Sequence, residues 1–244
     1  MSKLSLYVLI VGVCCFTQHL SSMVTNCPFP LTSKEKMIIE ENLQNFKAKL
    51  NKQTDIQGGD ATKRYDLRCT DLSNLNFAAN FKYLDLRGAC LDGSDFSTAK
   101  FEFVDLRKAS LKKIRANRAQ FWDCILDEAD FSDSDMPSVS FLGNDKQPLS
   151  AKKTNFTKAN ISAGSQLSNV DVSGAIFDQA NLNNVGLAYV KVSPQTSFKK
   201  TNLTMAILDH TTGQPSSLLA WLLGQGADLA NTFIDGKYTD IPTH

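Results

Sequence analysis

The region from residue 82 to residue 141 repeats with a period of five residues. Neither an α-helix, with about 3.6 residues per turn, nor a flat strand, with a repeat of about 2, produces this spacing. The period fits a chain that turns a corner every five residues, with two side chains pointing inward and three outward. Every fifth position is apolar: Leu86, Leu91, Phe96, Phe101, Leu106, Leu111, Ala116, Phe121, Leu126, Phe131, Met136 and Phe141.

The same region also repeats at twenty residues, which is the length of four short repeats. Four corners per turn would place each residue over its equivalent in the next turn, so like residues should stack into interior columns. The sequence therefore predicts an all-β solenoid in the form of a quadrilateral β-helix. The residues expected in the two clearest columns are Phe81, Phe101, Phe121 and Phe141, and Leu86, Leu106 and Leu126.

The pattern resembles the pentapeptide-repeat family, whose consensus is A(D/N)Lxx. It extends from Leu67 to Leu208 and includes stretches such as GACLD, GSDFS and KASLK. The resemblance implies a right-handed quadrilateral β-helix. It implies no single function, because proteins that share a fold serve different roles.

Four segments follow from this pattern: 1–22, 23–63, 64–212 and 213–244. Residues 23–63 are expected to hold an amphipathic helix from Thr32 to Lys52, and residues 64–212 the repeats. Residues 213–244 are expected to hold a short helix from Gln214 to Leu223 and a tail that is loose from Tyr238. Both helices are interpreted as caps, since an open solenoid end exposes apolar side chains and strand edges. A partner-binding helix at Thr32 to Lys52 and a homodimer formed through one end of the solenoid are the alternatives.

Residues 1–22 have the pattern of a secretory signal peptide. Lys3 precedes an apolar stretch from Leu4 to Phe16, and small residues follow at Ser21 and Ser22. The apolar stretch is short for a membrane span. We therefore expect a bacterial protein that is exported to the periplasm or secreted and has no membrane contact once the signal is removed. An uncleaved N-terminal anchor is the alternative.

Residues 142–153 interrupt the repeat. Lys146 stands where an apolar residue is expected, and Pro148 cannot donate a ladder hydrogen bond. Because Phe156 lies fifteen residues beyond Phe141, the register survives the interruption. We interpret this segment as a loop that leaves the rod, and as the first place to look for a partner site.

A basic cluster lies within residues 100–118: Arg107, Lys108, Lys112, Lys113, Arg115 and Arg118, with Lys100 before them. Such a cluster is typical of a nucleic-acid interface. Acidic residues twenty positions away favour a surface ion-pair ladder between neighbouring coils instead. The expected contacts are Arg107 with Asp127, Lys108 with Glu128, Lys113 with Asp133, Arg115 with Asp95 and Asp135, and Lys112 with Asp92.

Four cysteines follow the signal segment. Cys124 occupies an inward position and should act as a small core residue. One disulfide among Cys27, Cys69 and Cys90 is expected in an exported chain. A Cys27–Cys69 bridge would tie the cap to the rod, and a Cys69–Cys90 bridge would staple two coils; the first is favoured.

Catalysis and cofactor binding are not expected. The histidines, His19, His210 and His244, have no neighbours that suggest a triad or a metal site. We therefore predict a non-enzymatic, exported scaffold that binds an unknown protein partner.

The alternative is a protein that imitates DNA and interacts with a topoisomerase such as gyrase, as one branch of the family does. That mechanism needs a strongly negative rod in the cytoplasm. The net charge is +1, and removal of Lys3 with residues 1–22 leaves 25 basic residues against 25 acidic ones. A third possibility is nucleic-acid binding through the basic cluster.

Overall fold

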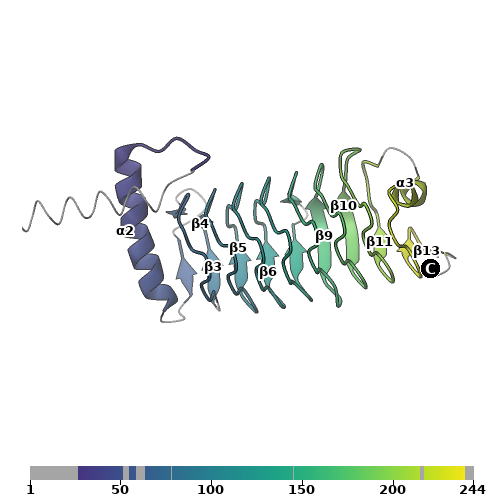
Figure 1. Cartoon of the computed structure of the whole chain (residues 1–244), viewed down its shortest axis with the longest axis horizontal. Coiled ribbons are helices and arrows are strands. Elements are labelled where there is room, and N and C mark those ends of the chain that lie inside the picture. The colour runs from purple at the N-terminus through teal and green to yellow at the C-terminus, as the bar shows by residue number, and fades with distance from the viewer. Residues whose placement is uncertain are drawn as a thin grey trace, which may run out of the picture.

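The chain forms a right-handed quadrilateral β-helix of about seven turns in the computed structural model (Figure 1), which confirms the predicted fold class. The structure describes residues 27–51, 55–58, 64–77, 79–144, 146–214 and 217–239. The predicted signal peptide at residues 1–22 lies outside these ranges. Neither helix within them has the length and apolar character that a membrane crossing requires.

One long sheet follows the rod, and its neighbouring strands are parallel except for the final pair, β12 and β13. Its eleven strands are β1 (Ile56–Gln57), β3 (Asn80–Lys82), β5 (Lys100–Glu102), β6 (Gln120–Trp122), β7 (Ser140–Leu142), β8 (Leu149–Ser150), β9 (Gln166–Asp171), β10 (Gly186–Lys191), β11 (Ile207–Asp209), β12 (Phe233–Ile234) and β13 (Lys237–Tyr238). A second pair joins β2 (Tyr65–Asp66) to β4 (Leu84–Asp85). Single bridges between successive coils continue the pairing elsewhere.

The corners of the coil explain the period of five. The residue two positions after an inward side chain has a left-handed backbone, with φ of 53° at Phe103, 59° at Lys108 and 56° at Lys113. Before each corner, an Asp or Asn side chain often accepts the N–H two residues later, as Asp95 does from Ser97 at 2.9 Å. This short-range bond stabilises a turn and explains why Asp and Asn recur in the repeat.

The core contains columns of identical residues from successive coils. The rings of Phe81, Phe101, Phe121 and Phe141 are stacked with 5.0 Å between successive centroids. A second phenylalanine column has centroid separations of 4.9–5.3 Å. Its members are Phe131, Phe156, Phe177 and Phe198, all buried.

The predicted loop at residues 142–153 is too long. Leu142 belongs to β7 and pairs with Trp122, and Leu149 is buried and pairs with Val170. Only residues 143–148, which we call the excursion, leave the coil. Asp105 pairs with Ile125 twenty residues later, whereas Ile125 pairs with a residue twenty-five positions later, so the excursion adds one repeat length.

Helix α2 (Ser33–Leu50) covers the N-terminal end of the rod (Figure 1). Thr32 and Glu35 form a capping box, and the helix ends two residues before the predicted Lys52. The ring of Phe46 lies 6.0 Å from that of Phe77 and 6.1 Å from that of Phe81. The helix therefore closes the phenylalanine columns at this end.

A short segment before α2 lies on the outside of the rod. A disulfide joins Cys27 to Cys69, with 5.1 Å between the Cα atoms. Pro28 packs over Gly88, where an added Cβ would lie 2.8 Å from the Pro28 ring. The ring of Phe29 lies beneath the Arg87 guanidinium at 5.4 Å. Together these contacts attach the N-terminal cap to the first coils.

At the C-terminal end, α3 (Leu218–Gly224) begins after the Ser217 N-cap rather than at the predicted Gln214. The coil then resumes, since Asp228 pairs with Asn202. Tyr238, predicted to be loose, lies in the β12–β13 hairpin, with its ring 5.0 Å from that of Phe233. The coil thus extends beyond the predicted boundary at residue 212.

The phenylalanine column can be tested at its centre. Phe121→Ala removes a fully buried ring that stacks on both sides. We expect the free energy of unfolding to fall by about 3–5 kcal/mol, measured by urea denaturation. Gln120→Ala, on the outward-facing neighbour, should change it by less than about 0.5 kcal/mol. Equal losses for the two variants would contradict the column.

The corner geometry predicts opposite effects at two adjacent exposed lysines. Lys200 has φ 55°, whereas Lys199 is not left-handed. Lys200→Gly should raise the free energy of unfolding by up to about 1 kcal/mol because glycine has no Cβ clash in this region. Lys199→Gly should lower it by about 0.5–1 kcal/mol through unfolded-state entropy. Thermal and urea unfolding would show whether the two signs differ.

Candidate functional site

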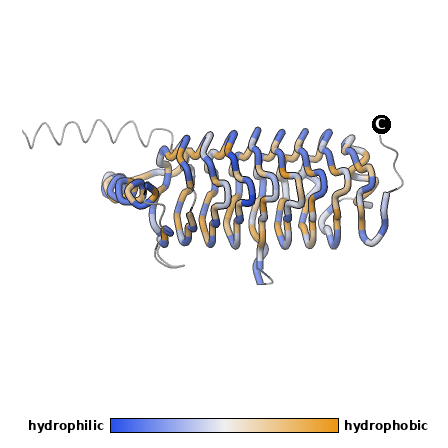
Figure 2. The backbone as a smooth tube through the Cα atoms, turned by 90° about the horizontal axis from the view of Figure 1, so that it is seen from below, coloured by the Kyte–Doolittle hydropathy of each residue, from blue (hydrophilic) through white to orange (hydrophobic). Residues whose placement is uncertain are grey.

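The excursion at residues 143–148 projects from the rod midway along its length (Figure 2). Asn144 shapes it, because its Oδ1 accepts the backbone N–H groups of Lys146 and Gln147 at 2.9 and 3.0 Å. The Asn144 amide donates to Asp123 Oδ1 at 2.8 Å. These bonds attach the excursion to the preceding coil.

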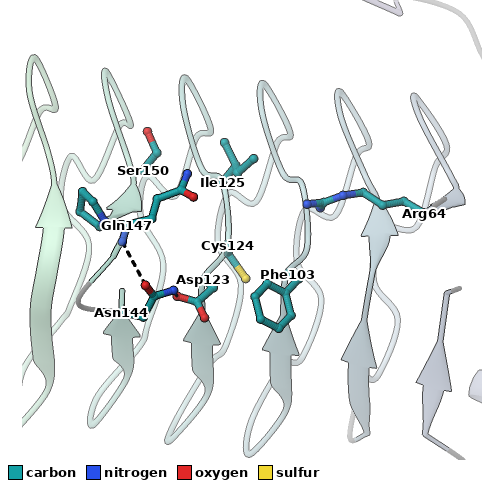
Figure 3. Close-up of a pocket in the computed structure, with 9 residues that line it drawn as sticks. Arg64, Phe103, Asp123, Cys124, Ile125, Asn144, Gln147 and Ser150 are labelled. Atoms are coloured by element: carbon teal, nitrogen blue, oxygen red, sulfur yellow. Dashed lines mark hydrogen bonds between the residues drawn. The ribbon is translucent and has the colours of Figure 1, made fainter. Parts of the chain in front are cut away.

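A pocket of about 130 Å³ lies beneath the excursion (Figure 3). The lining is mixed, with an apolar floor, amide groups and one charge of each sign. The residues that line it are Arg64, Phe103, Asp123, Cys124, Ile125, Asn144, Gln147, Pro148 and Ser150. Because pockets for free ligands usually measure about 300–1,000 Å³, this one has room for little more than a single side chain.

Arg64 brings the positive charge to the pocket from the first coil. Its side chain extends along the rod toward Phe103 (Figure 3). One guanidinium nitrogen lies 3.5 Å from the carbonyl oxygen of Leu84, which is a long hydrogen bond. Among the described residues this guanidinium has no other hydrogen-bond acceptor, so most of its donors are left for a ligand.

The pocket contains no activated nucleophile. Burial raises the pKa of the Cys124 thiol to about 12, so the thiol stays protonated. It lies 3.4 Å from the carbonyl oxygen of Trp122 and acts as a small core residue. Within the described residues, no group of three His, Cys, Asp or Glu side chains could hold a metal ion. The pocket can therefore recognise a group by shape and charge, and its residues suggest no reaction.

A ladder of aspartate–arginine pairs runs along one face beside the pocket. Asp-Leu-Arg occurs at residues 66–68, 85–87 and 105–107, a signal that the sequence analysis missed. In the last unit, Arg107 donates from Nε to Asp105 Oδ1 at 2.9 Å and from Nη2 to Asp105 Oδ2 at 2.6 Å. The three pairs, which we call the Asp–Arg ladder, are Asp66–Arg68, Asp85–Arg87 and Asp105–Arg107.

The ladder also fastens the N-terminal cap. Arg68 contacts Glu35 of α2 at 2.9 Å. The backbone N–H of Thr32 and then the Arg68 side chain lower the pKa of Glu35 to about 2. The ladder thus links the cap helix to the first coils.

The basic cluster forms some of the predicted ion pairs and replaces others. Lys108 pairs with Glu128 at 3.8 Å, and Arg115 pairs with Asp95 at 2.8 Å, as the twenty-residue offset suggests. Lys112 instead reaches Asp130 at 3.4 Å, because Asp92 accepts the Lys112 backbone N–H.

Arg107 does not pair with Asp127, since Asp105 lies two residues away on the same coil and is held by two nitrogens. No ion pair involves Lys113 or Arg118 in the described part of the chain. The cluster is therefore partly neutralised rather than a continuous positive surface.

Of the three outward cysteines, the structure pairs Cys27 with Cys69 and leaves Cys90 as a half-buried thiol. Burial raises the pKa of Cys90, which disfavours its thiolate. His210 lies on the surface beside Asp209 at 2.9 Å, away from the pocket lining. His19 and His244 lie outside the described residues.

Three solved structures illustrate the likeness to known proteins. HetL of Nostoc sp. strain PCC 7120, involved in heterocyst differentiation regulation, is 18% identical, with 82% of this chain and 98% of that chain covered and a TM-score of 0.33. QnrB1, a plasmid-mediated fluoroquinolone resistance protein, is 14% identical, with coverage of 68% and 87% and a TM-score of 0.46. A pentapeptide repeat protein of the Arabidopsis thaliana thylakoid lumen is 18% identical, with coverage of 65% and 70% and a TM-score of 0.19. Likeness at this level carries no statement about activity.

Sequence comparison with curated proteins gives no match. The family model for pentapeptide repeats matches eight copies at residues 79–115. The coil has the same five-residue corners before and after that stretch, from Cys69 to Met205. The chain therefore contains pentapeptide repeats, and the described coil continues their corner geometry on both sides of the matched stretch.

Proposed function

We propose that this protein is an exported, non-enzymatic scaffold whose rod presents the excursion and its pocket to a protein partner. The single observation that carries the proposal is the excursion itself. A polar segment that departs from the coil over a small pocket gives a partner a distinctive surface. Loops on rigid frameworks are where binding usually resides.

The Cys27–Cys69 disulfide supports export. Disulfides persist in oxidising compartments and are rare where thiols are kept reduced. The bridge begins five residues after the predicted signal ends at Ser22. Cleavage after Ser22 would leave the disulfide-bonded Cys27 close to the mature N-terminus.

Charge does not favour the other two functions. A rod that imitates DNA needs a predominance of acidic groups, and here the acids of the Asp–Arg ladder are each matched by an arginine. Binding of nucleic acid through the basic cluster needs several unpaired cations. Within the described residues only Lys113 and Arg118 of the cluster have no ion pair, whereas Arg107, Lys108, Lys112 and Arg115 are paired. A protein surface remains the best fit to the excursion.

The partner proposal predicts a position-dependent crosslink. A photo-reactive amino acid at Gln147, exposed on the excursion, should crosslink to a discrete protein in the producing cell. The same residue at Gln195, an exposed glutamine outside the pocket lining, should not. Mass spectrometry would identify the product. Identical products from both positions, or none from Gln147, would contradict the proposal.

The export proposal predicts a defined thiol count. Protein recovered from its native compartment and alkylated under denaturing conditions should carry two labels, on Cys90 and Cys124, and two more after reduction. Its N-terminus should lie after Ser22. Cys27→Ser should lower the free energy of unfolding by about 2–4 kcal/mol. Four labels without reduction would refute export to an oxidising compartment.

A further inference from the structure

The Asp–Arg ladder breaks beside the pocket. Arg68 Nε lies 3.9 Å from Asp85 Oδ2, and Arg87 Nε lies 3.8 Å from Asp105 Oδ2, so each of these arginines also faces the acid of the next coil. The residue that pairs with Asp105 in the following coil is Ile125. The position where the next acid would lie therefore holds an isoleucine.

Arg107 is the arginine left at the break. Its side chain is 43% exposed, against 14% for Arg68 and 26% for Arg87. The nearby Asp127 already accepts hydrogen bonds from the Ser150 hydroxyl and the Lys152 backbone N–H. Guanidinium has five N–H donors, and Asp105 engages only two of the nitrogens of Arg107. This cation has capacity for one more carboxylate.

The pocket adjoins the same break from the other side. Half-buried Ile125 and Ser150 line it together with Phe103 and Arg64. The side chains in Figure 3 place the Arg64 guanidinium on the side of Phe103, whereas Asp123 lies near the excursion with its carboxylate bonded to Asn144. The break thus combines apolar side chains, a donor-rich cation in the pocket and a second cation, Arg107, in the turn that follows Asp105 on the neighbouring coil.

We infer that this break receives one acidic side chain, Asp or Glu, of the protein partner, which completes the ladder in trans. The inference rests on the proposed function and specifies the chemistry of its site. The methylene stem would pack on Ile125 and Phe103, and the carboxylate would face Arg107 and Arg64. Charge-assisted bonds from guanidinium to carboxylate are strong and geometrically specific. Asp123 repels negative charge at the excursion end of the pocket. A ligand with one carboxylate, held at the Arg64 end, therefore fits better than a run of phosphates.

Two peptides that differ by one charge test the inference. We would titrate acetyl-Leu-Glu-Leu-amide and acetyl-Leu-Gln-Leu-amide into the disulfide-bonded, ¹⁵N-labelled protein and follow its amide resonances. The glutamate peptide should shift the resonances of Ile125, Ser150 and Arg107. It should leave the resonance of Asn181 unchanged, because Asn181 lies on another face of the coil, where its side chain is hydrogen-bonded to those of Asn160 and Asn202. The glutamine peptide should bind about tenfold more weakly.

Four variants distinguish the site from general charge effects. Arg107→Gln and Arg64→Gln should each raise the Kd for the glutamate peptide about tenfold, whereas Arg118→Gln should not change it. Ile125→Asp supplies the missing acid in cis, so it should abolish peptide binding while thermal unfolding shows a melting temperature at or above that of the parent.

The inference is overturned if both peptides bind equally, or if Ile125→Asp folds normally and still binds the glutamate peptide as tightly as the parent. These outcomes are distinct from failure of the scaffold proposal. If the crosslink at Gln147 persists in Arg107→Gln, the scaffold proposal is supported and the acid-binding inference is contradicted. Absence of the Gln147 crosslink in the parent protein would contradict the scaffold proposal itself.

Discussion

Within the coil, most side chains lie beside the equivalent residues of the coils before and after, because successive coils pair in parallel and nearly in register. For apolar residues this arrangement is favourable. Flat rings stack at about the spacing of hydrogen-bonded strands, about 4.8 Å, so a column of phenylalanines fills the interior with no change of geometry from coil to coil. The core is therefore a consequence of repetition rather than of a unique arrangement of shapes.

The same constraint is unfavourable for charges, since a strict repeat would stack like charges at short range. The chain resolves this conflict within the three coils of the Asp–Arg ladder. An arginine two residues after an aspartate neutralises it directly and also faces the aspartate of the next coil, as Arg87 does with Asp85 and Asp105. Where the sequence departs from this alternation, as at Ile125, the outer surface has an apolar side chain in place of an acid and an arginine that, among the described residues, has no ion pair to the next coil.

The sequence predicts the interior well and the outer surface poorly. The period of five and the recurrence at twenty identify the Phe101 column, since both depend only on spacing. The Phe131–Phe156 contact was not predicted because the excursion changes the offset to twenty-five. The pairing of Arg107 was predicted wrongly because only residues of neighbouring coils were considered. The pocket was not predictable in detail, since Arg64 reaches it from a distant coil.

The excursion lengthens the offset between neighbouring coils by one repeat, and the coils on either side of it keep their pairing. Elsewhere the offset grows by a single residue, from twenty to twenty-one, between Lys191 and Thr212. Corners therefore tolerate changes in chain length that a globular core would not, because only the exit and entry points must stay one coil apart. Such a rod can acquire new surface segments by insertion during evolution, and an engineer could graft a foreign loop at the same corner without redesigning its interior.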